Sequence, residues 1–144
     1  MTIVQLWTYA LQIENAGGPE SIWGFIDGTI RGISRPVKRQ EDYYTGYKKG
    51  HGIKFQAIIT SDGLISHLSG PWYGKVGDWK AWVESCMPDI IELMFADMEE
   101  VDKLWLYGDS GYHNTSGIIE AITKPPSERL TEEEKYHNQA MARL

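Results

Sequence analysis

The segment Leu104–His113, LWLYGDSGYH, constrains the fold of this chain most. It opens with apolar strand formers that do not alternate with polar residues, a pattern typical of a strand buried on both faces. Gly108 and Asp109 follow directly, so a charge lies at the carboxyl end of a buried strand. In open α/β sheets, ligands bind beyond the carboxyl ends of the strands. The segment predicts an α/β fold and makes Asp109 a candidate ligand-binding residue.

The rest of the sequence predicts a helix, three strands, further helices, the strand at Leu104 and a last helix. Apolar residues at helical spacing predict the helices, and strand formers between glycine and turn residues predict the strands. The expected helices cover about residues 3–14, 79–86, 90–98 and 131–144. The expected strands, a meander, are Trp23–Thr29, Ile53–Thr60 and Leu64–Gly70.

Single residues refine the expected ends and faces of the helices. Pro88 ends or restarts the helix before it. Thr131 and Glu134 have the spacing of a capping box, with Tyr136, Ala140 and Leu144 on one face of the helix that follows. The inner face of the first middle helix is expected to contain Trp79, Trp82, Val83 and Cys86, the single cysteine, as a small core residue.

The composition limits the class of protein. A chain of 144 residues has the size of one domain. No apolar run approaches the roughly 20 residues that span a membrane, and the N-terminal segment does not resemble a signal peptide.

The net charge of −6 hides a basic window between Arg31 and Lys54. The window contains seven basic and two acidic residues, interleaved with tyrosines and His51. This mixture favours a surface that binds a nucleic-acid backbone, and a solvated loop is the alternative. The candidate DNA-binding residues are Arg35, Lys38, Arg39, Lys48 and Lys49.

The predicted order of elements is that of an RNase H-like mixed sheet, in which the first and fourth strands are neighbours. Asp27, near the end of the first strand, and Asp109 would then lie at one end of the sheet, although either alone reads as a turn aspartate beside glycine. Paired carboxylates suit hard divalent cations. Two such ions about 4 Å apart can activate the attacking oxygen and stabilise the leaving oxygen of a phosphodiester.

Four motifs resemble a known family. GFIDGT, YTGYKKGHGIKFQAIITSDGLISHLSGPWYGKVGDWKAW, LYGDSGYH and KYHNQAMARL are similar to blocks of PIF/Harbinger-type transposases, which are DDE superfamily endonucleases. The resemblance covers about residues 20–144. It implies a DDE-type RNase H-like catalytic domain over residues 19–144, preceded by an N-terminal helix over residues 1–18.

The resemblance also implies the chemistry. Asp27 and Asp109 would be catalytic, metal-binding carboxylates with Mg²⁺ or Mn²⁺ in a two-metal site. The substrate would be DNA at transposon ends, in the nucleus, with a separate Myb-like DNA-binding protein as a partner. The family's third acid follows an arginine that Arg143 matches, so the domain is expected to be incomplete at its C-terminus. Glu132, Glu133 and Glu134 are not at that position and are expected to be helix-start charges.

Two accessory candidates remain, each with a simpler alternative. Asp78 matches the aspartate of a His-Asp pair in the family, with Gly77 in place of the histidine, and it could instead cap a helix. His113 could reach a metal or a phosphate, or be an ordinary loop histidine. The sequence therefore supports a metal-dependent DNA endonuclease and strand-transfer domain. The alternative is an inactive or domesticated transposase remnant that binds DNA or protein.

Overall fold

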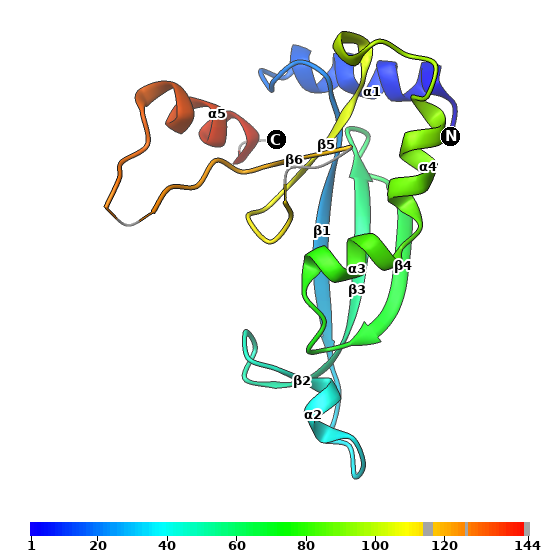
Figure 1. Ribbon diagram of the computed structural model, residues 1–144, viewed down its shortest axis with the longest axis vertical. Coiled ribbons are helices and arrows are strands. Elements are labelled where there is room, and N and C mark those ends of the chain that lie inside the picture. Colours follow the sequence, from blue (N-terminus) through cyan, green and yellow to red (C-terminus); the bar gives the residue numbers. More distant parts are fainter. Residues whose placement is uncertain (114–116, 126, 143–144) are drawn as a thin grey trace.

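The computed structural model describes residues 1–113, 117–125 and 127–142 (Figure 1). No helix in these ranges is long and apolar enough to cross a membrane. The elements are α1 (Ile3–Asn15), β1 (Ile22–Gly32), α2 (Gln40–Tyr43), β2 (Tyr44–Thr45), β3 (Gly50–Thr60), β4 (Ile65–Tyr73), α3 (Asp78–Glu84), α4 (Met87–Met94), the 3₁₀ turn η1 (Glu100–Asp102), β5 (Trp105–Gly108), β6 (Ile118–Glu120) and α5 (Glu132–Ala142).

The strands form one mixed sheet with β1 and β3 at its centre. Strand β3 pairs antiparallel with β1, with β4 and, near its first residues, with β2. Strand β5 lies parallel to β1 on the other side and continues to the parallel strand β6. The predicted α/β class, the meander and the later parallel strand are confirmed, whereas β2 and β6 were not predicted.

Strand β4 forms an outer edge of this sheet. Within the described residues it pairs with β3 alone. The segment contains no Asp, Glu, Lys or Arg, and its Ile65 and Leu68 side chains are exposed.

The main core lies between one face of the sheet and the helices α1, α3 and α4. Ile26 of β1 and Ile58 of β3 lie opposite each other and pack with Trp82 of α3. Leu6 and Ala10 of α1 belong to the same cluster. The N-terminal helix therefore shares a core with the sheet, while the domain division at residue 18 stays a prediction.

A second, smaller cluster covers the opposite face. Met141 of α5 is buried there, and Phe25 and Tyr107 of the sheet pack against this cluster. Figure 1 shows α5 beside β5 and β6, apart from α3 and α4. Because side chains alternate along a strand, Asp27 is on the face of β1 that contains Phe25.

Several predictions about the helices are corrected. Cys86 is exposed, with a φ of 60°, and Val83 is exposed as well, so neither is a core residue. Helix α3 has only seven residues, and the chain turns at Cys86 before the apolar stripe can continue to that position. Pro88 restarts the helix, in the first turn of α4.

At the C-terminal end, the capping box of α5 is confirmed. The Glu134 amide donates to Thr131 Oγ1 at 3.2 Å, and the Thr131 amide donates to Glu134 Oε2 at 2.7 Å. Tyr136, expected to share one face of this helix with Ala140 and Leu144, is exposed. The Ala140 side chain, Arg143 and Leu144 lie outside the described residues.

Candidate active site

The structure brings Asp27 and Asp109 together on neighbouring strands. In the parallel pair β1 and β5, Ile26 lies opposite Gly108, and each is followed by one of the two aspartates. Both aspartates line one cavity of about 600 Å³. The end of a buried strand thus places Asp109 beside Asp27, although their catalytic role stays a prediction.

The turn after β5 fixes the Asp109 carboxylate. The Gly111 amide donates to Asp109 Oδ1 at 2.8 Å, and the Tyr112 amide donates to the Asp109 carbonyl at 3.1 Å. Tyr112 then returns into the core, where it is fully buried. Asp109 is therefore both a turn aspartate and a cavity residue, and the turn holds its carboxylate at the cavity.

Asp78 is a third carboxylate at this place. It also lines the cavity, and Lys54 Nζ donates to its Oδ1 at 3.0 Å. Helix α3 begins at Asp78 and its N-cap residue is Gly77. The interpretation of Asp78 as a helix cap is therefore wrong, because its carboxylate is directed to Lys54 on β3.

Two glycines make room for the Asp78 carboxylate. A Cβ atom on Gly28 would overlap Asp78 Oδ1, and one on Gly111 would lie 3.4 Å from Asp78 Oδ2. Gly28 directly follows Asp27, and Gly111 comes two residues after Asp109. The missing side chain at Gly28 allows Asp78 to lie against β1, and Gly111 brings the turn after β5 close to the same carboxylate.

A buried polar cluster on β3 contacts Asp78 and Tyr112. Lys54 and Gln56 are both buried and lie on the same face of the strand as Ile58. Gln56 Nε2 donates to Tyr112 Oη at 2.9 Å and to the Asp78 carbonyl at 3.3 Å. Lys54 and Gln56 were not predicted from the sequence as site residues. Their signal was two polar residues at a spacing of two in a central strand, which places both on one face.

Burial, together with neighbouring negative charges, changes the proton affinity of the site. Partial burial raises the pKa of Asp27 above its usual value, and the charges of Asp109 and Asp78 add to this effect. The Gly28 amide and the Lys54 ammonium act in the opposite direction on the Asp27 pKa. Burial, and then the Asp78 charge, also raise the pKa of Tyr112, so its hydroxyl stays protonated.

The carboxylate oxygens of the cavity are of the type that a hard divalent cation binds, but they are few. Carboxylate oxygens are the ligands that Mg²⁺ and Mn²⁺ prefer, and a cation would relieve the repulsion felt by Asp27. However, the part of the chain that the structure describes contains no group of three or more His, Cys, Asp or Glu side chains arranged to hold a metal ion. The site therefore fits a cation that takes most of its oxygen ligands from water or from a substrate.

His113 has a packing contact. It is exposed, and its ring lies edge to face against Trp79 with centroids 5.1 Å apart. This contact accounts for its position, and a role at a metal or a phosphate stays a prediction.

The basic window is less uniform than expected. It contains α2 and β2, and its last residue, Lys54, is buried in β3. Lys48 lines the carboxylate cavity, with its ammonium 5.0 Å from the centroid of the Tyr47 ring. Lys75, from outside the window, also lines this cavity and binds Asp42.

The other basic candidates differ in how they are held. Arg39 Nε donates to Asp42 Oδ2 at 2.6 Å, and its guanidinium lies over the Tyr73 ring. Arg35 Nε donates to Gln40 Oε1 at 2.7 Å. Lys38 and Lys49 are exposed. The proposed DNA contacts of these side chains stay a prediction.

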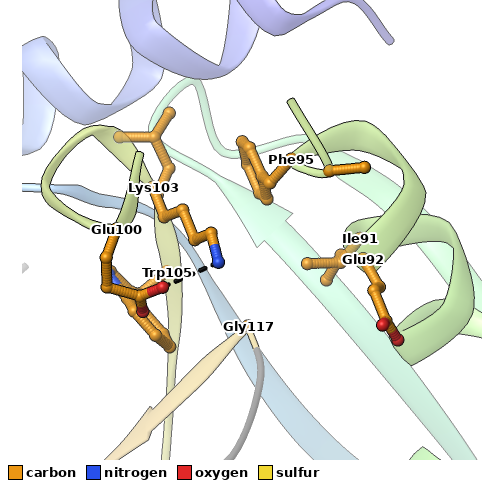
Figure 2. A pocket seen from close by; sticks show the side chains of 9 residues that line it. Ile91, Glu92, Phe95, Glu100, Lys103, Trp105 and Gly117 are labelled. Carbon is orange, nitrogen blue, oxygen red and sulfur yellow. Dashed lines mark hydrogen bonds and ion pairs between the residues drawn. The ribbon is translucent and has the colours of Figure 1, made fainter. Parts of the chain in front are cut away.

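A separate cavity of about 460 Å³ lies between α4 and the start of β5 (Figure 2). Figure 2 shows Ile91 and Phe95 on one side and Lys103 reaching Glu100, with Nζ 2.7 Å from Oε2. The cavity is lined by Trp105, at the opposite end of β5 from Asp109. It therefore does not belong to the carboxylate site.

Comparison with known families gives the class of the chain. The family described as DDE superfamily endonuclease matches residues 26–144. Because the match covers most of the sequence, the chain belongs to this endonuclease family. The comparisons with curated proteins and with solved structures each gave no significant match.

Proposed function

We propose that this chain is the catalytic domain of a PIF/Harbinger-type transposase, a DNA endonuclease and strand-transfer domain with an RNase H-like sheet. The observation that carries the proposal is that Asp27 of β1 and Asp109, directly after the parallel strand β5, line one cavity of a DDE superfamily endonuclease. The wider proposal includes transposon-end DNA as substrate, a separate Myb-like partner and the nucleus, and it rests on the resemblance of the sequence motifs.

The residues of the cavity have distinct roles in this proposal. Asp27 and Asp109 would hold Mg²⁺ or Mn²⁺ through carboxylate oxygens. Such an ion, when bound, supplies Lewis-acid stabilisation of a phosphodiester under attack. Lys48 and Lys75 on the cavity wall would attract the phosphate backbone. The turn at Asp109 would keep its carboxylate in one orientation, because two main-chain donors fix that segment.

Metal binding by the purified chain tests the proposal. Titration with Mn²⁺ in a calorimeter should give a weak, about millimolar, affinity, because two carboxylates supply few of the ligands that a dication needs. Asp27→Asn and Asp109→Asn should each abolish it, whereas Asp97→Asn, an exposed control, should not change it. Equal Mn²⁺ affinity in all four proteins would contradict the site.

A nicking assay on supercoiled DNA, with Mg²⁺ and with Mn²⁺, tests the reaction itself. We expect little or no cutting by the 144 residues alone, because Asp27 and Asp109 supply too little negative charge for two dications. Robust nicking that disappears in Asp109→Asn would show that another residue, such as Asp78 or His113, completes the site.

The second candidate function is a remnant that binds DNA or protein without cutting. It is favoured by the engagement of Asp78 with Lys54 and by the lack of a three-residue metal group among the described residues. DNA binding that persists in chelator, together with no measurable Mn²⁺ binding, would support the remnant.

A further inference from the structure

Lys54 is a buried cation beside the proposed metal site. Only 6% of the residue is exposed, and its ammonium donates to Asp78 Oδ1 at 3.0 Å. A buried ammonium is costly unless it is paired and hydrogen-bonded. A lysine of the central strand β3 is thus paired with one carboxylate of the cavity.

Asp78 is held from several sides at once. Lys54 binds one carboxylate oxygen, and Gln56 Nε2 donates to the main-chain carbonyl at 3.3 Å. The backbones at Gly28 and Gly111 lie close to the carboxylate. These contacts fix the position of Asp78 and leave little room for its carboxylate to turn.

The pairing determines the charge that a metal ion would meet. Asp27, Asp78 and Asp109 bring three negative charges to the cavity, and Lys54 offsets one of them. The remaining charge of these four residues is that of two carboxylates, and Lys48 on the cavity wall offsets part of it. Without Lys54, Asp78 would be a charged, unpaired carboxylate with the chemistry of a metal ligand.

We propose that Lys54 is a positioning residue that sets the metal affinity of this site, because its ammonium cancels the charge of Asp78 and keeps that carboxylate from acting as a third ligand. The inference rests on the proposed function. It implies that the site holds a dication weakly until the phosphates of DNA add oxygen ligands. Metal and DNA then strengthen each other's binding by the same factor.

Two substitutions with opposite expected effects test the proposal by calorimetry with Mn²⁺ alone. Lys54→Met keeps the length of the side chain and frees Asp78, so Mn²⁺ should bind about tenfold more tightly. Asp78→Asn leaves the ammonium uncompensated, so Mn²⁺ should bind about tenfold more weakly. In the double variant both charges are absent, and the affinity should return to within about threefold of the original.

The controls separate positioning from general structural damage. Lys54→Arg keeps the charge and should keep the weak Mn²⁺ affinity of the original chain. Lys103→Met breaks the pair with Glu100 far from the cavity and should change nothing. If both Lys54→Met and Asp78→Asn weaken Mn²⁺ binding, or neither changes it, the proposal is wrong. If Lys54→Met does not fold, the Asp78→Asn variant tests the proposal by itself. Mn²⁺ binding to that variant that is unchanged or tighter would then overturn the proposal.

The outcomes also distinguish this inference from the proposed function. If Asp27→Asn and Asp109→Asn leave Mn²⁺ binding unchanged, the metal site itself is wrong. If those two abolish binding while Lys54→Met leaves it unchanged, the metal site stands and only the role of Lys54 fails. A further readout is the effect of a DNA duplex, which should tighten Mn²⁺ binding more in the original chain than in Lys54→Met.

Discussion

At the scale of single residues, the carboxylate site depends on positions that lack a side chain. Gly28 and Gly111 lie where a Cβ atom would contact the Asp78 carboxylate. The contact at Gly28 is an overlap, so even alanine would displace Asp78 from Lys54. The absence of a side chain at Gly28 is therefore a requirement of the site, whereas at Gly111 the tightest contact of a Cβ atom would be with Asp109 of the same turn.

Gly28→Ala should destabilise the fold strongly. The new methyl group separates Asp78 from Lys54, and breaking a buried ion pair by loss of one partner costs about 3 kcal/mol. For a chain of this size we expect the melting temperature to fall by about 10 °C in differential scanning calorimetry. Gly32→Ala on the same strand is the control, because nothing lies within 4 Å of its Cβ position. Equal melting temperatures for the two variants would contradict the close approach.

Asp42→Asn should lower stability in a pH-dependent way. The Lys75 ammonium, and then the Arg39 guanidinium, hold the pKa of Asp42 below its usual value of 3.8. Because the folded-state pKa is lowered, the stabilisation is complete above the unfolded value and is lost as the pH falls through the folded value. The melting temperature of the variant should be lower at about pH 7, and the difference from the original should shrink as the pH falls below the usual pKa of 3.8. Asp97→Asn, an exposed position, should show no such difference.

Asp27 and Asp109 could be predicted as a pair from the sequence, because each lies at or near the end of a predicted strand and the order of elements makes those strands neighbours. The ion pair between Asp78 and Lys54 could not be predicted from the sequence. It depends on the tertiary placement of the first residue of α3 over β1 and β3, which no local pattern encodes. Lys54 was counted only as one charge of the basic window, although its spacing of two from Gln56, and of four from Ile58, places all three on one face of the strand.

At the scale of elements, helix α1 contributes to the core although all of it precedes the residues that match the family. The family match begins at residue 26, yet Leu6, Ala10 and Ile13 of α1 are buried. The spacing of its apolar residues and the glycines after it were sufficient to predict the helix. Strand β6 has only three residues, which is too short for any periodicity to be read from the sequence.

Leu6→Ala should show whether α1 is an integral part of the fold. Leu6 is 2% exposed in the main core, so its truncation should cost about 3 kcal/mol. Leu11→Ala removes the same atoms from a side chain that is 57% exposed and should cost less than about 1 kcal/mol. Urea unfolding followed by circular dichroism measures both. Similar midpoints would support an N-terminal helix that is separate from the catalytic domain.

At the scale of the whole molecule, positive charge is concentrated between Arg31 and Lys54, although the chain as a whole is acidic. One of the seven basic residues of the window, Lys54, is buried and does not contribute to the surface. Lys48 brings part of the remaining charge to the cavity of Asp27 and Asp109. The composition predicted the excess, but only the tertiary structure shows which side chains are free to meet a polyanion.

Replacing Arg35, Lys38, Arg39, Lys48 and Lys49 by alanine should weaken nonspecific DNA binding. The slope of log affinity against log salt should fall by about 0.9 for each phosphate contact that is lost. Fluorescence anisotropy with a labelled duplex at several salt concentrations measures both quantities. As a control, alanine at Lys80, Lys103 and Lys135, outside the window, should have a smaller effect. An unchanged slope in the fivefold variant would mean that the window is only a solvated surface.

The uncharged edge at β4 has a consequence for the behaviour of the protein in concentrated solution. A strand edge without charges, with exposed Ile65 and Leu68, is a template on which other chains can add. Concentrated samples should therefore scatter light as they age, and Leu68→Lys should raise the concentration at which scattering begins. Lysine at the already exposed Leu93 of α4 is the matched control, since it adds the same charge away from any strand. The exposed edge of β4 is thus expected to determine the concentration at which this protein begins to associate.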